Sequence, residues 1–166
     1  PEFIHRDESG KTTRIEVVAG TLEKASAPDP APRSWAADPG NEVAIWYMEM
    51  EAGAQWDLPP ASSATNRSLY FFEGEQIHLH GVPVPAGKVL HLAADQEVNI
   101  LNGTEKGRFL LLQGRPIGEA VASYGPFVMN TQEEIRQTYR DYQQTRFGGW
   151  PWSRPDMVHG PTKGRF

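Results

Sequence analysis

Apolar and polar residues alternate in short runs along the first 113 residues, and turn residues separate the runs. Alternation with a period of two is typical of strands that bury one face. The runs predict strands at Lys11–Ala19, Glu42–Glu51, Gln55–Leu58, Lys88–Leu92, Glu97–Leu101 and Arg108–Gln113. Turn signals recur roughly every 8 to 12 residues, a spacing that indicates an all-β sandwich or barrel.

The stretch Ser68–Gly81 is predicted to form the centre of this β structure. It contains a strand, a tight acidic turn at Glu73–Glu75 and a second strand. His80 and Gly81 then form a plausible two-residue turn, because glycine adopts positive φ without steric cost.

Two histidines in this stretch, His78 and His80, are two residues apart and therefore point to the same face of a strand. Paired imidazoles of this kind suit a metal site. Ile77 and Leu79, on the opposite face, are better candidates for the interior. The pattern therefore favours a solvent-facing His78 and a turn residue His80.

Three aromatic residues, Trp46, Trp56 and Tyr70, are predicted to belong to the core, with the lining of a barrel interior as the alternative. The proline-rich segment Thr21–Asn41 is predicted to be a long loop that Trp35 pins to the body of the domain.

The character of the sequence changes after Gly114, and 115–166 is expected to be an extension to the β domain of 1–114. Thr131 and Glu134 form a capping-box pattern, which predicts one helix over about 132–144. The tail 150–166 is rich in aromatic residues, so we expect it to pack on the barrel or on a partner domain.

Composition excludes several classes of function. The 166 residues have a formal charge of −5 and no Lys/Arg block, which argues against direct nucleic-acid binding. There is no cysteine, so disulfides and thiolate sites are excluded, and a reducing cytoplasm is the expected location. No apolar run approaches the roughly 18 residues of a membrane span, and no signal peptide is recognised.

A specific pattern covers the second half of the chain: Gln-Gly-Arg-Pro-Ile-Gly-Glu at 113–119, Tyr-Gly-Pro-Phe-Val-Met-Asn-Thr at 124–131 and Phe-Gly-Gly-Trp-Pro-Trp at 147–152. Leu-Tyr-Phe-Phe-Glu-Gly-Glu at 69–75 fits the same pattern. The chain thus resembles the C-terminal half of pirin-like proteins, which are cupins.

The resemblance implies a jelly-roll β-barrel with one C-terminal helix. It also implies a second, N-terminal barrel that holds a metal, usually iron, through three His and one Glu. Family members are linked to quercetin 2,3-dioxygenase activity and to transcription regulators as partners. Pro1 has no Met before it and falls about where a linker from the first barrel would end.

The cupin metal motif is degenerate in this chain. With Gly53 as its anchor, the two His positions fall at Pro59 and Ala61, and the Glu position falls at residue 65 or 66. The His position of the second motif falls at Leu90. None of these positions carries the expected ligand, so no metal is expected in this chain, and iron or another divalent metal is expected in the N-terminal barrel.

Strand parity leaves one alternative, in which His78, His80 and His91 form a surface cluster that binds a divalent ion adventitiously. No catalytic or cofactor-binding residue is recognised.

Two functions follow as hypotheses. One is a metal-free structural or interaction domain, which completes a two-barrel protein by contacting its N-terminal pirin domain. The other is part of an iron-dependent quercetin 2,3-dioxygenase-like enzyme, active only together with that domain.

Overall fold

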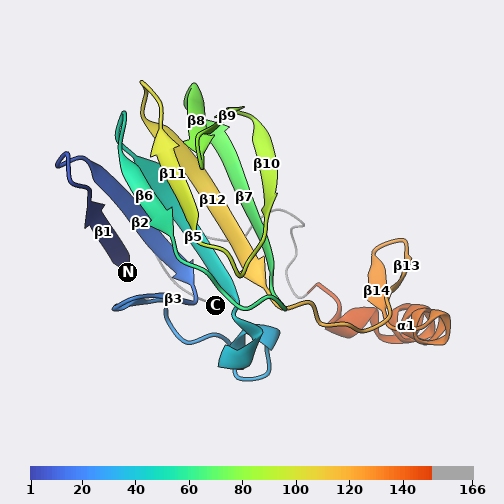
Figure 1. The fold of residues 1–166 in the computed structure, drawn as a ribbon. Coiled ribbons are helices and arrows are strands. Elements are labelled where there is room, and N and C mark those ends of the chain that lie inside the picture. Colours follow the sequence, from blue (N-terminus) through green and yellow to red (C-terminus); the bar gives the residue numbers. More distant parts are fainter. Residues whose placement is uncertain (151–166) are drawn as a thin grey trace. The chain divides into compact units, whose positions relative to one another are not determined.

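The computed structural model describes residues 1–150 (Figure 1). The chain divides into two compact units, one of residues 1–117 and one that begins at Gly118. Each unit is described by itself. The tail, for which packing on the barrel or on a partner domain is predicted, lies outside the described residues apart from Trp150. Within the described part, no helix is long and apolar enough to cross a membrane.

The first unit is built from two antiparallel sheets (Figure 1). The larger sheet has the strand order β1 (Glu2–Arg6), β2 (Thr12–Ala19), β5 (Ala44–Met50), β12 (Gly107–Gly114), β7 (Asn66–Glu73), β10 (Lys88–Leu92). The smaller sheet has the order β6 (Gln55–Leu58), β11 (Val98–Asn102), β8 (Gln76–Leu79), β9 (Val82–Pro85). All the strands predicted from the sequence are confirmed, with ends that shift by two residues at most.

The hydrophobic core lies between the inner faces of the two sheets. Alternate residues of each strand point inward, as the period of two predicts. From the larger sheet, Phe71 and Phe109 are fully buried, and their rings stack with centroids 4.8 Å apart. From the smaller sheet, Ile77 and Ile100 are fully buried in the same cluster. The predicted inward orientation of Ile77 is therefore confirmed.

Three predicted core aromatics separate into two groups. Trp46 and Trp56 are buried in the core cluster, as predicted. Tyr70 is only half-buried, and the prediction for it is wrong. Its neighbours Leu69 and Phe71 are the inward residues of β7, so alternation turns Tyr70 to the outer face.

A tight hairpin joins β8 to β9, as predicted at His80 and Gly81. Both residues have positive φ, +46° and +82°. This is the conformation of the two-residue turns that suit the twist of a hairpin. Leu79 and Val82 pair directly across the turn.

Two strands of the two main sheets were not predicted. Strand β1 is an edge strand that pairs only with β2, and its two end residues, Glu2 and Arg6, are polar and exposed. Strand β9 contains Pro83 and Pro85, which normally exclude a strand. It is tolerated because β9 is also an edge strand, where proline costs no ladder hydrogen bond on the open side.

The predicted loop Thr21–Asn41 is mostly irregular but contains short elements. Strands β3 (Thr21–Leu22) and β4 (Ala25–Ser26) form a small hairpin. Two 3-10 turns follow, η1 (Trp35–Ala37) and η2 (Pro39–Asn41). Trp35 does pin the loop, because its Nε1 donates a 2.9 Å hydrogen bond to the carbonyl of Arg115.

The second unit packs a hairpin against one helix. The hairpin consists of β13 (Ala122–Tyr124) and β14 (Phe127–Met129), and the helix is α1 (Gln132–Thr145), followed by the 3-10 turn η3 (Arg146–Gly148). The predicted capping box is present: Glu134 N donates to Thr131 Oγ1, and Thr131 N donates to Glu134 Oε2. The Phe127 ring meets Tyr139 edge to face at 4.9 Å. This hairpin was not predicted.

Adjacent residues of β7 offer a direct test of the inward and outward assignment. Phe71 is fully buried, whereas Phe72 is 50% exposed. We expect Phe71→Ala to lower the free energy of unfolding by about 3–5 kcal/mol, since it leaves a cavity in the core. Phe72→Ala should change it by no more than about 0.5 kcal/mol. Urea denaturation of both variants measures the difference, and equal losses would contradict the assigned strand orientation.

Candidate functional site

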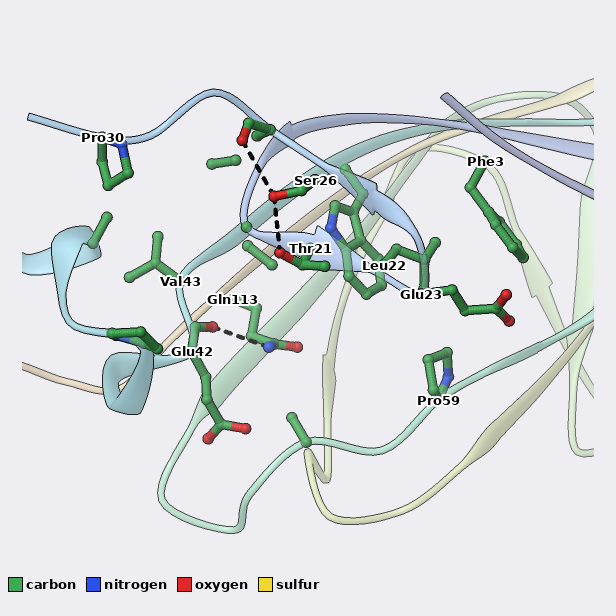
Figure 2. Close-up of a pocket in the computed structure, with 18 of the residues that line it drawn as sticks. Phe3, Thr21, Leu22, Glu23, Ser26, Pro30, Glu42, Val43, Pro59 and Gln113 are labelled. Carbon is green, nitrogen blue, oxygen red and sulfur yellow. Dashed lines mark hydrogen bonds between the residues drawn. The ribbon is translucent and has the colours of Figure 1, made fainter. Parts of the chain in front are cut away.

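A cavity of about 660 Å³ lies at one end of the two sheets. The β3–β4 hairpin contributes Thr21 and Leu22, and the strands below contribute Trp46 and Gln113. Figure 2 shows the hairpin residues together with Pro59 and Gln113 among the residues that line the cavity. The cavity is of the size that small-molecule sites commonly have.

The most unusual residue of the cavity is Arg67, whose side chain is buried (3% exposed). Its Nε and Nη2 donate to Gln113 Oε1 at 2.8 and 2.6 Å, and its Nη1 donates to the Pro59 carbonyl at 2.7 Å. These acceptors are neutral, and no carboxylate of the described residues forms an ion pair with Arg67. Burial lowers the pKa of the guanidinium, while the charge of Glu42 opposes that shift.

Gln113 is held in place from its other side. Its Nε2 donates to the Glu42 carbonyl at 3.0 Å, the bond drawn in Figure 2. The amide orientation that results directs Oε1 at Arg67. Strands β7 and β12 are neighbours in the sheet, and Arg67 lies directly opposite Gln113 in their register.

The Glu42 carboxylate is directed to a different loop. It accepts hydrogen bonds from the Ser62 hydroxyl, from Thr65 Oγ1 at 2.9 Å and from Ser62 N at 3.2 Å. These hydrogen bonds lower the pKa of Glu42 from its usual value, and the bond from the Ser62 hydroxyl has the largest effect. The carboxylate therefore ties the loop before β7 to the start of β5.

The cavity is also lined by a residue with an unsatisfied polar atom, Trp46. The indole N–H of Trp46 is buried, and it has no hydrogen-bond acceptor among the described residues. A buried donor without an acceptor costs free energy, about 1–3 kcal/mol.

Acidic side chains also contribute to the lining. Glu23 and Asp29 are exposed, Asp38 accepts from Gly40 N, and Asp57 accepts from Asn99 Nδ2 at 2.6 Å. The cavity thus combines one buried cation with carboxylates, most of them at exposed positions.

Two of the degenerate ligand positions lie in this cavity. Pro59 and Ala61 both line it, and the Pro59 carbonyl is an acceptor for Arg67. Leu90 packs against the core on β10, opposite Leu69. At the fourth position, Thr65 is buried and bonded to Glu42, and residue 66 begins β7.

These residues do not fit a metal ion. None of them offers a carboxylate or an imidazole, and the buried guanidinium of Arg67 would repel a cation nearby. Among residues 1–150, no three His, Asp or Glu side chains gather as metal ligands.

The structure does not bring the three candidate histidines together. His91 is exposed on β10 and pairs with Ser68 Oγ at 3.0 Å. His78 is half-buried on β8, within 3.4 Å of Gln76 Nε2, and His80 lies in the turn near the Glu97 carbonyl. Strand β8, which carries His78, and strand β10, which carries His91, belong to different sheets, so strand parity does not place these two histidines on one face.

Sequence reasoning missed Arg67 and its partner Gln113. A signal was present, since Leu69 and Phe71 predict the inward face of β7, and the same parity places Arg67 inward. An arginine on the buried face of a strand requires partners, and these come from β12, far along the chain.

The fold and the motifs agree with known proteins. The family model for the pirin C-terminal cupin domain matches residues 45–148. The chain therefore belongs to the pirin family, as a C-terminal cupin domain of the kind predicted.

Individual proteins with similar sequences or structures include pirin-like proteins and a quercetin 2,3-dioxygenase. A pirin-like protein of Solanum lycopersicum is 40% identical over 54% of this chain and 32% of its own length. A pirin-like protein of Caulobacter vibrioides is 39% identical over 80% of this chain and 45% of its own length. The crystal structure of a quercetin 2,3-dioxygenase from Acinetobacter baumannii is similar with a TM-score of 0.68 and 26% identity, over 89% of this chain and 47% of that one. The chain thus spans about half the length of such relatives or less.

The Glu42 hydrogen bonds predict a pH dependence of stability. The pKa of Glu42 is lower in the folded state, so its contribution is fully present above the unfolded value, about 4.3. The contribution is lost as the pH falls through the folded-state value. We expect Glu42→Gln to be less stable than the wild type at pH 7, with a difference that narrows below about pH 4.

Chemical denaturation of both proteins between pH 7 and pH 3 measures this difference. Glu23→Gln is the matched control, because Glu23 is an exposed carboxylate of the same cavity. A difference for Glu42→Gln that stays constant with pH would show that the carboxylate charge is not what binds the loop.

Proposed function

We propose that this chain is a metal-free structural half of a two-barrel pirin, and that it docks on the other barrel through the outer face of its larger sheet. The observation that carries the proposal is the apolar character of that outer face. A sheet that packs on one side and faces water on the other normally has polar outward residues.

The outward residues of the central strands are mostly apolar. Ser68 on β7 and His91 on β10 point outward and are polar. The apolar outward residues come from β5, β12, β7 and β10, and they are Ile45, Tyr47, Leu110, Leu112, Tyr70, Phe72 and Val89. Phe72 is 50% exposed and Val89 47% exposed. We call this set the outer apolar face.

The register makes the outer apolar face continuous. Leu110 lies opposite Tyr47 on one side and opposite Tyr70 on the other. Tyr70 in turn lies opposite Val89. Side chains directly opposite one another on a sheet are in contact range, so the apolar strip crosses four strands. Exposed apolar patches of this kind mark interaction sites.

A charged cluster borders one end of this strip. Arg108 donates through Nη1 to both oxygens of Glu73 at 2.7 Å and through Nε to Glu49 at 2.9 Å, and Lys106 adds a 2.7 Å bond to Glu49. The pKa of Glu49 falls to about 2, chiefly because of Lys106 and then Arg108. An apolar centre with a polar rim is the usual anatomy of a protein interface.

The relatives supply the argument for the partner. The aligned region covers 45% of the Caulobacter vibrioides protein and 47% of the Acinetobacter baumannii structure, so a segment of comparable length accompanies it in each. We propose that a metal-binding barrel of this kind covers the outer apolar face. The whole protein is then a candidate quercetin 2,3-dioxygenase-like enzyme, to which this chain contributes contacts and no metal ligand.

Substitution on the outer apolar face tests the docking. The partner in this test is the proposed N-terminal barrel of the same protein, expressed separately. Val89→Asp places a charge in the strip, and we expect its dissociation constant for the partner to rise about 10-fold or more, measured by isothermal titration calorimetry. Val82→Asp is the matched control, since Val82 is an exposed valine of the smaller sheet (62% exposed).

Equal affinity for the two variants would contradict docking through this face. The absence of any encoded upstream barrel would contradict the proposal as a whole. Circular dichroism of both variants checks that the fold is retained.

Metal analysis tests the metal-free assignment. After treatment with a chelator and desalting, the 166-residue chain should retain iron far below one ion per chain. The protein that includes the upstream barrel should recover close to one ion after reloading. Stoichiometric iron in the 166-residue chain, measured by plasma mass spectrometry, would contradict the assignment.

A further inference from the structure

We propose that the cavity beneath the β3–β4 hairpin is a binding site for a small organic monoanion, with an apolar body and a carboxylate that Arg67 receives. This site is separate from the docking role of the outer apolar face, because Arg67 and Trp46 are buried on the inward face of their strands. It also needs no metal.

The guanidinium of Arg67 has donors to spare. A guanidinium carries five N–H groups. Three of them are engaged, two with the Gln113 amide oxygen and one with the Pro59 carbonyl. The two that remain, one on Nη1 and one on Nη2, have no acceptor among the described residues.

The charge of Arg67 is also unpaired by direct contact. A buried charge is costly unless a counter-charge is bound to it, and its present acceptors are both neutral. Glu42 is the carboxylate that acts on it electrostatically, but the oxygens of Glu42 are occupied by Ser62 and Thr65. A carboxylate brought by a ligand would supply the missing charge and accept from the planar donor fork.

Trp46 gives a second and independent indication of a ligand. Its buried indole N–H lacks an acceptor, and Trp46 lines the same cavity as Arg67. Arg67 and Trp46 both line this cavity, and both carry N–H donors that have no acceptor within residues 1–150. A ligand with two oxygen atoms is complementary to such a pair of residues. The indole ring itself offers an apolar surface.

The remaining walls define the body of the ligand. Phe3, Leu22, Val43 and Trp56 supply apolar surface. A volume of about 660 Å³ admits a molecule with one or two rings. The hairpin residue Leu22 is itself buried, so the hairpin is held as part of the wall.

The acidic residues of the cavity limit the charge of the ligand. Glu23, Asp29, Asp38 and Asp57 repel anions in proportion to their charge. A monoanion can offset this repulsion through Arg67 alone. A dianion or trianion cannot, which distinguishes the proposed ligand from phosphate or citrate.

The competing explanation is that Arg67 serves only to join β7, β12 and the end of β6. In that case the cavity would show no preference between a carboxylate and a neutral molecule of the same shape. The test therefore compares phenylacetate with its neutral isostere phenylacetamide on the wild-type chain, at constant ionic strength.

The readout is the indole N–H resonance of Trp46 in a nitrogen-15 correlation spectrum, assigned by its loss in Trp46→Phe. We expect phenylacetate to shift this resonance saturably and phenylacetamide to bind about 10-fold more weakly or worse. Citrate should leave the resonance unchanged.

Two arginine variants locate the charge that matters. Arg67→Met should weaken phenylacetate binding about 10-fold or more, and Arg67→Lys, which keeps the charge but loses the fork, should weaken it less. Arg14→Met is the control, because Arg14 is an exposed arginine of the outer side, paired with Glu2. It should bind phenylacetate like the wild type.

Three results would overturn the proposal: no saturable binding of phenylacetate, equal binding of the amide, or full affinity in a folded Arg67→Met. The comparison of acid and amide uses the wild-type chain, so it decides the matter even where Arg67→Met fails to fold. If phenylacetate does not bind, the proposed docking through the outer apolar face is unaffected, because the two tests concern different surfaces.

Discussion

A buried guanidinium organises one end of the molecule. Arg67 occupies an inward position of β7 and connects the side chain of Gln113 on β12 with the carbonyl that follows β6. Gln113 in turn is fixed by the start of β5. An isolated buried charge is costly, so the ends of these strands are held where their acceptors can form hydrogen bonds with the Arg67 guanidinium.

The larger sheet is apolar on both faces at its centre, and this property joins its structural and its functional roles. Its inner face, with Phe71 and Phe109, packs on the smaller sheet. Its outer face, with Phe72 and Val89, remains exposed in this chain. Alternation along each strand places neighbouring residues on opposite faces, one in the core of this unit and one on the outer face where we propose that docking occurs. Stability and association can therefore be altered separately.

Most of the fold could be predicted from the sequence, because strong alternation and a capping box are local signals. Strands β6 and β10 were predicted to the residue, and the helix nearly so. The failures have physical causes. Strand β9 contains two prolines that only an edge position permits. The hairpin Ala122–Met129 has short, mostly exposed strands that depend on α1 for packing, so no burial pattern marks it.

The sequence by itself determined most strands of the two main sheets, the helix and the residue types at Pro59, Ala61 and Leu90, since each depends on local order or on identity. Tertiary structure decided which strands share a sheet. His78 and His91 have equal parity yet lie on different sheets. Arg67 meets Gln113 only because β7 pairs with β12, 46 residues away along the chain at this contact. Strand parity specifies a face, whereas the neighbour across that face depends on long-range pairing.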